Sequence, residues 1–258
     1  MEVTGAVSLE DRGDGIFSLQ LSNPTKRNAL TSGMWDTIIA HLQELARTDC
    51  RALVIAGGGD HFCSGADVSD LGASKNGKSN ADLTAEGLEL LRRTSVPTIA
   101  AIRGTCLGGG LALALACDFQ IADDTARLGI PAARLGLVFS VRQTRILIAQ
   151  VGAMNAKKLL LSGQPVTAAE ARTMGLVSEV CGSSVDERAL ALARTLTGNA
   201  PLAVAGSKRI VLDTVDAIVE RPVAPALEDA VQAAKNSDDH AEAKRAFAEK
   251  RKPMFTGR

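Results

Sequence analysis

Short apolar runs alternate with amphipathic stretches along the first half of this chain. Residues 15–21, 52–56 and 96–104 gather apolar and β-branched side chains near glycines, so each run predicts a buried strand. Apolar residues recur at helical spacing after Thr31, a good capping residue, and again over residues 82–94. Strands that alternate with helices predict an α/β fold with crossover connections.

The second half of the chain has a different pattern. From about residue 152 onward the spacing of apolar residues is helical throughout, with Pro201, Pro222 and Pro225 as expected breaks. Before that, residues 69–80 are polar and rich in Gly, Ser and Asn, which predicts a mobile loop. A chain of 258 residues is long enough for one sizeable domain with a full core and a small helical appendage.

Glycine-rich turns follow two of the predicted strands, GGGDHFCSGAD at 57–67 and GTCLGGG at 104–110. Glycine lets the backbone approach a ligand closely, and the N–H groups that start the following helix have no partner within it. Such groups suit an anion or the oxyanion of a polarised carbonyl, and one from each turn can converge on a single oxygen. Close packing of helix against strand is the alternative explanation of the glycines.

These motifs resemble those of the crotonase (enoyl-CoA hydratase/isomerase) superfamily across nearly the whole chain. The matching segments are NPTKRNALTSGM (23–34), HFCSGADV (61–68), PTIAAIRGTCLGGGLALALACD (97–118), SGQPVTAAEARTMGLVSEV (162–180) and KRKPMF (250–255). The resemblance implies a spiral of ββα units with a helical C-terminal region that packs against neighbouring subunits in a homotrimer, or in a homohexamer of two trimers. Residues 1–195 are expected to form the core and residues 196–258 the trimerisation region.

The same resemblance implies a ligand and its binding residues. An acyl-CoA thioester is expected to place its carbonyl oxygen in an oxyanion hole formed by the backbone N–H groups of Ala66 and Gly109. Coenzyme A enters as part of the substrate, with no separate cofactor and no metal. The residues expected to bind substrate or CoA are Lys26, Arg27, Ala29, Ser64, Ala66, Asp67, Val68, Gly109, Phe247 and Lys250, the last two reaching a neighbouring subunit's site. For Lys26 and Arg27 an ordinary charged turn is the alternative.

Acids on which hydration depends are absent at the matching positions. Ala112 and Ala132 stand where the family's hydratases have glutamates, Ser140 stands where some relatives have another acid, and the chain has no tyrosine. Hydration of a conjugated double bond needs a base to activate water and an acid to protonate Cα, and alanine supplies neither. We therefore expect a lyase or isomerase of fatty acid metabolism with a non-standard reaction: isomerisation, decarboxylation, or thioester or carbon–carbon cleavage. A non-catalytic acyl-CoA carrier or regulator is the alternative.

A remote third possibility rests on Gly72–Ser79, GASKNGKS, which fits the Walker A pattern of a P-loop NTPase. A working P-loop needs a buried strand directly before its first glycine, and the preceding CSGADVSDL is not such a strand. Under the resemblance this segment is instead a variable loop over the acyl end of the substrate.

Composition excludes several other classes of protein. Lys and Arg together number 29, as do Asp and Glu, so charge gives no argument for nucleic acid or an acidic membrane surface. The N-terminal residues lack the apolar core of a signal peptide, and no apolar run is long enough for a membrane span. Five scattered cysteines without metal-ligand spacing indicate reduced thiols, so a cytoplasmic location is expected.

Several further side chains allow either a catalytic or a structural role. We expect His61 to support its turn, His41 and His240 to lie on the surface, Glu86 and Glu89 to be solvated, Cys63 to be a core thiol, and Asp67 and Asp118 to stabilise turns. Arg142 and Arg145 can meet an acidic group of the substrate or face solvent, and the sequence does not decide between these.

Overall fold

The computed structural model describes residues 5–70, 74–75, 77–182 and 184–257. These residues form two compact units. The first extends to Leu128 and resumes over Thr167–Asp213, and the second comprises Gly129–Val166 and the chain from Thr214 onward. The division into residues 1–195 and 196–258 stays a prediction, since it concerns the region expected to contact other subunits.

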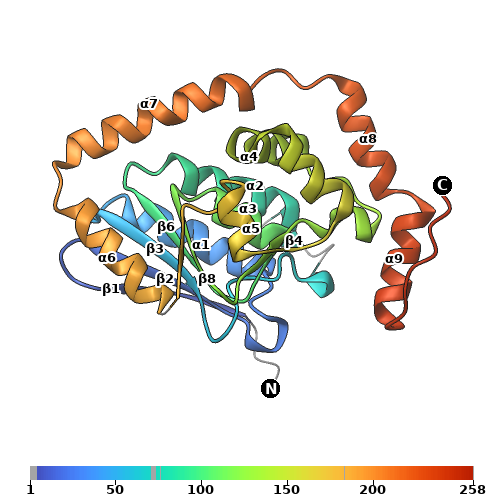
Figure 1. Cartoon of the computed structure of the whole chain (residues 1–258), viewed down its shortest axis with the longest axis horizontal. Coiled ribbons are helices and arrows are strands. Elements are labelled where there is room, and N and C mark those ends of the chain that lie inside the picture. The colour runs from blue at the N-terminus through green and yellow to red at the C-terminus, as the bar shows by residue number, and fades with distance from the viewer. Residues whose placement is uncertain (1–4, 71–73, 76, 183, 258) are drawn as a thin grey trace. The chain divides into compact units, whose positions relative to one another are not determined.

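Within the described residues of the first unit, six strands form one sheet in the order β1-β2-β3-β6-β8-β11 (Figure 1). Their bounds are Ala6–Asp11 (β1), Ile16–Ser22 (β2), Ala52–Gly57 (β3), Thr98–Ile102 (β6), Phe119–Asp123 (β8) and Glu179–Cys181 (β11). β1 pairs antiparallel with β2, and the other neighbours are parallel. The predicted α/β class is therefore confirmed. β1 was not predicted, because its six residues alternate only between half-buried and exposed.

Helix α6 (Val185–Thr197) packs on one face of this sheet (Figure 1). Alternate residues of the strands supply the other side of this core. The cluster contains Ile16, Ala52, Val54, Ile99, Ala101 and Ile121 from the strands, and Val185, Ala189 and Ala193 from the helix. Because successive strand residues point to opposite faces, these positions share one face of the sheet.

Three more helices of the first unit lie between its strands in sequence: α1 (Ser32–Leu45), α2 (Asn80–Arg93) and α3 (Gly109–Leu115). The predicted cap of α1 is confirmed, since Thr31 Oγ1 accepts a hydrogen bond from the Met34 N–H at 3.2 Å. α1 and α2 pack closely because Gly87 has no side chain. A Cβ at Gly87 would lie 2.7 Å from the Trp35 ring. The same unit contains the short helix α5 (Ala168–Thr173) and two 3-10 turns, η1 (Pro24–Lys26) and η2 (Val68–Asp70).

The second unit is mainly helical. It contains the 3-10 segment η3 (Pro131–Leu135) and the helices α4 (Val141–Ser162), α8 (Pro225–Lys235) and α9 (Asp238–Ala248), and α7 (Pro201–Val219) contributes to both units. The expected breaks at Pro201 and Pro225 are confirmed as helix starts. α4 is interrupted at Gly152, whose φ of 73° and ψ of 165° only glycine adopts readily.

The prediction of helix throughout from residue 152 is wrong at two places, β10 (Val166–Thr167) and β11. Strands of two or three residues are too short to show a period, and pairing with distant residues creates them. β11 pairs with β8, which lies more than 50 residues earlier in the chain. The remaining short strands are β4 (Ser74–Lys75), β5 (Lys78–Ser79), β7 (Thr105–Leu107) and β9 (Arg127–Gly129). Across the described residues no helix combines the length and apolar character that a membrane span requires.

Candidate functional site

Two parallel bridges join the glycine-rich turns of the first unit to neighbouring segments. In the first, the Cys63 N–H donates to Thr105 O at 2.9 Å and the Leu107 N–H donates to Cys63 O at 3.0 Å. Gly110 permits this approach, because a Cβ there would lie only 2.3 Å from the Cys63 carbonyl oxygen. The loop after β3 is therefore fastened beside the segment that leads into α3.

The second bridge fastens the same loop to the residues before α1. The Leu30 N–H donates to Gly65 O at 2.8 Å, and the Asp67 N–H donates to Leu30 O at 2.9 Å. In a trans peptide the C=O and N–H groups point in opposite directions. Because Gly65 O faces Leu30, the N–H of Ala66 points away from Leu30.

That N–H lies beside the first residue of α3. A Cβ built on Gly109 would be 3.4 Å from the Ala66 nitrogen, so the two backbone nitrogens are neighbours. Gly109 opens the helix, where N–H groups have no intrahelical partner. Within the described chain neither N–H group donates to a protein acceptor. We call these two groups the amide pair; Ala66 is exposed and Gly109 partly so, which leaves them accessible.

Gly108, which precedes the amide pair, has a conformation that other residues avoid. Its φ is 52° and its ψ is −115°. Gly108 is the single residue between the end of β7 at Leu107 and the start of α3 at Gly109, so its conformation reverses the backbone there. Gly108 and Gly110 thus allow the close approach of these backbone segments, both for packing and at the two N–H groups. That the two groups form an oxyanion hole stays a prediction.

Asp67, next to Ala66, is held by an ion pair. Lys26 Nζ donates to Asp67 Oδ2 at 2.7 Å and to Ser69 Oγ at 2.8 Å. Ser69 in turn donates its N–H and its hydroxyl to Asp67 Oδ1, at 3.0 and 2.7 Å. Burial by itself raises the pKa of Asp67, but the hydrogen bonds from Lys26 and Ser69 outweigh burial and hold the pKa below its usual value. The predicted turn-stabilising role of Asp67 is confirmed.

The other predicted CoA-binding residues in the range 27–68 belong to the same two segments of the chain as this ion pair. The Ser64 N–H donates to Arg27 O at 3.0 Å, and Ser64 Oγ donates to Lys26 O at 2.8 Å. Ala29 is buried, with 6% of its surface exposed. Arg27 is exposed, and its guanidinium has no hydrogen-bond or ion-pair partner within the described chain. The side chain of Val68 lies outside the described residues.

The three positions where relatives have acids hold side chains that are neither acids nor bases in this chain. Ala112 lies on α3 of the first unit with 2% of its surface exposed, and Ala132 lies in η3 of the second unit. Ser140 caps α4, since its Oγ accepts from the Gln143 N–H at 3.3 Å. The serine hydroxyl therefore has a structural role that the sequence analysis did not foresee, although a serine just before a helix is a common capping signal.

The nearby histidine and cysteine are also structural. His61 Nδ1 accepts from the Thr105 N–H at 3.2 Å, which confirms its expected support of the turn. Cys63 is fully buried, and burial raises the pKa of its thiol to about 12. Such a thiol is almost entirely protonated at neutral pH and is not an activated nucleophile. All five cysteines are free, as expected.

Of the two remaining histidines and Asp118, some match the expected placement and one does not. His240 is not a surface residue. It is 8% exposed, and its Nδ1 lies 2.7 Å from Leu135 O, because α9 packs against η3. His41 is only half-buried and pairs with Glu44. Asp118 stabilises its turn as expected, accepting from the Thr98 N–H at 2.8 Å and from Lys208 Nζ at 2.7 Å.

Four charged side chains have protein partners that the sequence could not show. Arg142 forms an ion pair with Glu220 at 2.7 Å, and Arg145 donates to the carbonyl oxygens of residues 219, 221 and 222. Neither arginine simply faces solvent, because both hold α4 against the end of α7 within the second unit. Glu86 pairs with Lys78, and Glu89 pairs with Arg93.

Asn28 and Asp70 are site-supporting residues that the sequence analysis missed. Asn28, 1% exposed and at φ 58°, donates to Gly58 O and His61 O, at 2.9 and 2.7 Å. Asp70 accepts from Ser32 Oγ at 2.6 Å and from Asn80 Nδ2 at 3.1 Å, which links the starts of α1 and α2. The asparagine in NAL was the available signal, since asparagine tolerates positive φ.

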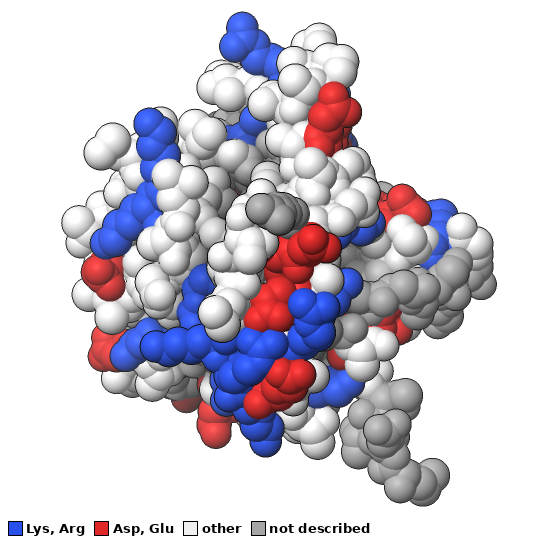
Figure 2. All heavy atoms as spheres, turned by 90° about the vertical axis from the view of Figure 1, so that its right-hand side faces the viewer, with Lys and Arg blue, Asp and Glu red and all other residues white. Residues whose placement is uncertain are grey.

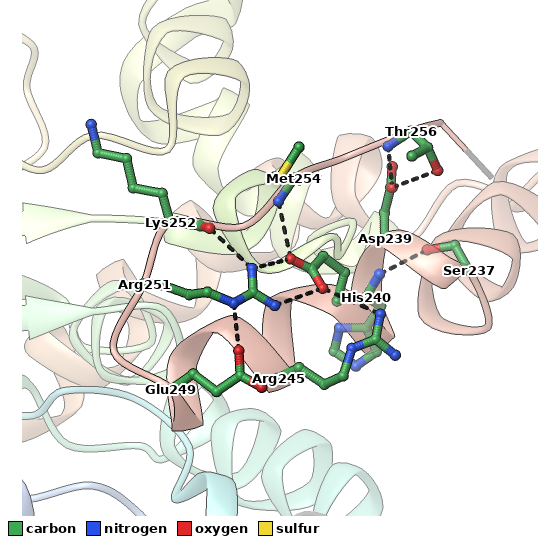
Figure 3. Close-up of polar contacts among 10 residues, drawn as sticks. Ser237, Asp239, His240, Arg245, Glu249, Arg251, Lys252, Met254 and Thr256 are labelled. Atoms are coloured by element: carbon green, nitrogen blue, oxygen red, sulfur yellow. Dashed lines mark hydrogen bonds and ion pairs between the residues drawn. The ribbon is translucent and has the colours of Figure 1, made fainter.

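Phe247 and Lys250 belong to a separate structure in the second unit. Phe247 lies on α9 and is 66% exposed, while Lys250 follows the helix in a left-handed conformation, φ 54°. Glu242 of α9 holds the chain after it, accepting from Arg251 Nη2 at 3.0 Å and from the Met254 N–H at 3.1 Å (Figure 3). On the side where α9 lies, basic and acidic side chains are intermingled rather than gathered in a patch of one sign (Figure 2).

Comparison with known proteins gives consistent similarities over the full chain. The Enoyl-CoA hydratase/isomerase family model matches residues 11–258. The chain is 32% identical to the 2,3-dehydroadipyl-CoA hydratase of Escherichia coli K12, covering 96% of this chain and 97% of that protein. It is also 32% identical to the peroxisomal Delta(3,5)-Delta(2,4)-dienoyl-CoA isomerase of Arabidopsis thaliana, over 93% and 92% of the two chains. The crystal structure of carnitinyl-CoA hydratase from Mycobacterium avium matches with a TM-score of 0.84 and 33% identity, over 98% and 99% of the chains.

Proposed function

Because the chain belongs to the enoyl-CoA hydratase/isomerase family, we propose that it binds an acyl-CoA thioester with the carbonyl oxygen at the amide pair. The observation that carries this proposal is the position of the Ala66 nitrogen beside Gly109, with both N–H groups accessible and without acceptors among the described residues. Two donors aimed at one oxygen are the arrangement that polarises a carbonyl.

Polarisation at this position favours chemistry next to the carbonyl. As a proton or carboxylate leaves Cα, negative charge moves onto the thioester oxygen, and the two N–H groups stabilise the resulting enolate. One such donor typically contributes about 3–4 kcal/mol at the transition state. Because both donors belong to the backbone, this contribution does not depend on which side chains surround the site.

We propose a reaction other than efficient hydration. Ala112 and Ala132 provide neither the base that activates water nor the acid that protonates Cα, and the Ser140 hydroxyl already caps α4. Isomerisation, decarboxylation, and thioester or carbon–carbon cleavage all proceed through a polarised thioester. The similarity to a dienoyl-CoA isomerase supports a reaction in this group.

A non-catalytic acyl-CoA carrier or regulator is the second candidate. In the described loop beside the amide pair, the carboxylates of Asp67 and Asp70 are both occupied by hydrogen bonds. With alanines at the expected acid positions and no tyrosine, the amide pair then serves affinity alone.

The P-loop alternative loses support. Part of Gly72–Ser79 lies outside the described residues, namely residues 72, 73 and 76. The described residues just before it form the 3-10 turn η2, and Lys78–Ser79 forms a short hairpin with Ser74–Lys75. A P-loop needs a buried strand at the first of these places.

Assembly and location complete the proposal. The family resemblance supports a homotrimer or homohexamer in which Phe247 and Lys250 contact a neighbouring subunit's CoA. The scattered cysteines support a cytoplasmic location. Sedimentation analysis of the purified protein tests the assembly directly.

The test of function is incubation with saturated, 2-enoyl, 3-enoyl and malonyl-type CoA thioesters, followed by mass spectrometry and parallel binding measurements. Turnover of one class identifies the reaction. Tight binding with every thioester recovered unchanged establishes the carrier. Absence of binding to all of them contradicts the proposal, and stabilisation by Mg-ATP alone would favour the P-loop alternative.

A further inference from the structure

Lys26 and Arg27 are neighbours in sequence, yet their side chains have different surroundings. The Lys26 ammonium is held by Asp67 and Ser69, whereas the Arg27 guanidinium has no partner within the described chain. We infer that Lys26 is a positioning residue for the Ala66 amide and not a ligand of CoA, which leaves Arg27 as the cation of this segment that is expected at the CoA phosphates. The inference rests on the proposed function, because it concerns the same thioester site.

The charge of Lys26 is already neutralised by Asp67 in the protein without ligand. Its Nζ lies 2.7 Å from Asp67 Oδ2, and only 5% of the Asp67 side chain is exposed. Removing the ammonium would leave a buried carboxylate oxygen without its cation, which is costly. A ligand phosphate that drew Lys26 away would have to compensate for this loss, so Lys26 is poorly suited to phosphate binding.

Asp67 fixes the backbone at Ala66. The Asp67 N–H donates to Leu30 O at 2.9 Å, and Asp67 O accepts from the Asp70 N–H at 3.0 Å. With its side chain held by Lys26, Asp67 is thus fixed through the main chain and the side chain together. The Gly65–Ala66 peptide, which carries the Ala66 N–H, lies between this fixed residue and the hydrogen bond from the Leu30 N–H to Gly65 O. It therefore has little freedom to rotate, and the Ala66 N–H keeps its direction toward Gly109.

Lys26 also reaches the loop from its other end. Lys26 O accepts from Ser64 Oγ at 2.8 Å, and Arg27 O accepts from the Ser64 N–H at 3.0 Å. Residues 64–67 are therefore attached to residues 26 and 27 at both ends of the loop. Loss of the ion pair releases one of these two attachments.

Arg27 has the properties that phosphate binding requires. It is exposed, its backbone carbonyl is fixed by Ser64, and its guanidinium presents several donors in a fixed geometry that matches phosphate oxygens. Its charge has no protein counter-ion to displace within the described residues.

Two ligands that differ only at the carbonyl separate the two roles. Butyryl-CoA carries the thioester oxygen, and S-butyl-CoA has a methylene in its place; the ratio of their Kd values, measured by calorimetry, is the carbonyl preference. We expect Lys26→Met and Asp67→Asn each to lower this preference by about three- to tenfold, the size of a coupling between groups in contact. Because both remove the same ion pair, the double variant should be no worse than either single variant.

Arg27→Met is the matched control. It should weaken both ligands by the same factor, leave the carbonyl preference unchanged, and reduce the dependence of Kd on ionic strength, since exposed charge interactions are screened by salt. The inference is overturned if Lys26→Met instead shows this pattern, with equal losses for both ligands and a weaker salt dependence.

A measurement without ligand keeps the inference testable if the proposed function fails. Backbone hydrogen exchange at residues 64–69 should become faster in Lys26→Met and stay unchanged in Arg27→Met, with circular dichroism confirming that both variants are folded. Unchanged exchange in Lys26→Met overturns the positioning role. A wild-type protein with no carbonyl preference overturns the proposed function instead, so the two failures are distinguishable.

Discussion

The turn that carries Gly109 in the first unit and the turn that carries Ala132 and Ser140 in the second unit differ in the chemical groups that they present. The first presents a backbone N–H that has no acceptor in the described part of the chain and lies beside a second N–H from Ala66. The other turn presents a methyl group and a hydroxyl that already accepts from the Gln143 N–H. One turn therefore provides hydrogen-bond donors from the main chain, while the other provides no acid or base.

This difference separates two parts of thioester chemistry. Stabilising an enolate requires donors, and any residue except proline supplies a backbone donor once the fold positions it. Moving a proton requires a titratable side chain at a defined place, so one substitution can remove it. Under the proposed function, a chain with this combination would polarise a thioester without the two acids that hydration usually needs.

Gly109→Pro should have the largest effect on turnover, because it removes one of the two backbone N–H groups of the amide pair. Proline removes the N–H but is well tolerated at the first position of a helix. If the amide pair stabilises an enolate, turnover should fall by about 10²–10³-fold, the usual loss for one such donor. Affinity for S-butyl-CoA, which lacks the carbonyl, should change much less. The turnover rate is measured with the thioester that the wild-type protein converts. The Kd values for butyryl-CoA and S-butyl-CoA are measured by calorimetry.

Gly109→Ala is the control for Gly109→Pro. It keeps the N–H, and its Cβ would lie 3.4 Å from the Ala66 nitrogen, an ordinary contact distance. It should retain most of the wild-type behaviour. Equal losses in the alanine and proline variants would point to packing rather than to the missing donor, and unchanged behaviour in the proline variant would remove Gly109 from the site.

The strands and the glycine-rich turns around the amide pair were predicted correctly from the sequence, for a physical reason. A buried strand has a continuous run of apolar residues, which predicted β2, β3 and β6. Glycines mark the places where two backbone segments come close, so the turns next to these strands were predicted as well. The family and fold inferred from those motifs are confirmed by the similarity over residues 11–258.

What the sequence did not predict depends on partners that are distant along the chain. Lys26 was assigned to CoA, yet its closest partner is Asp67, 41 residues away. Arg145 similarly finds its acceptors near residue 220, and His240 is buried by a carbonyl 105 residues earlier in the chain. A charged or polar side chain gives no sequence signal of which surface it will meet. Only its position in the folded chain decides whether it is free to bind a ligand.

Ala112→Glu on α3 combined with Ala132→Glu in η3 would supply the two acids that are absent at the expected positions. Hydration of crotonyl-CoA should rise above background by about 10²-fold, the lower end for general acid–base catalysis, because grafted groups are not optimally oriented. The matched control is Ala112→Gln with Ala132→Gln, which adds the same bulk without an acid. Ala112 is 2% exposed, so thermal unfolding must show that both double variants are folded. No gain in a folded, CoA-binding Glu variant would mean that the site is shaped for another reaction.

The smallest expected effect compares two carboxylates, Asp67 beside the amide pair and Glu242 on α9. Hydrogen bonds from Arg251 and from the Met254 N–H lower the pKa of Glu242 from its ordinary value near 4.5 to about 2. A lowered pKa in the folded state means that the ionised carboxylate stabilises the fold fully above pH 4.5, and that this contribution is lost as the pH falls toward 2. NMR titration of the Glu242 carboxyl carbon should therefore have its midpoint near 2.

Glu242→Gln should flatten the decline of unfolding free energy between pH 4.5 and 2, whereas Glu228→Gln, which removes an exposed carboxylate on α8, should not. Neither variant should alter the carbonyl preference measured with butyryl-CoA and S-butyl-CoA, because Asp67 rather than Glu242 is attached to the Ala66 loop. A changed carbonyl preference in Glu242→Gln would show that the segment after α9 contributes to the thioester site. The loop of Asp67 and the segment after α9 would then no longer differ in their role.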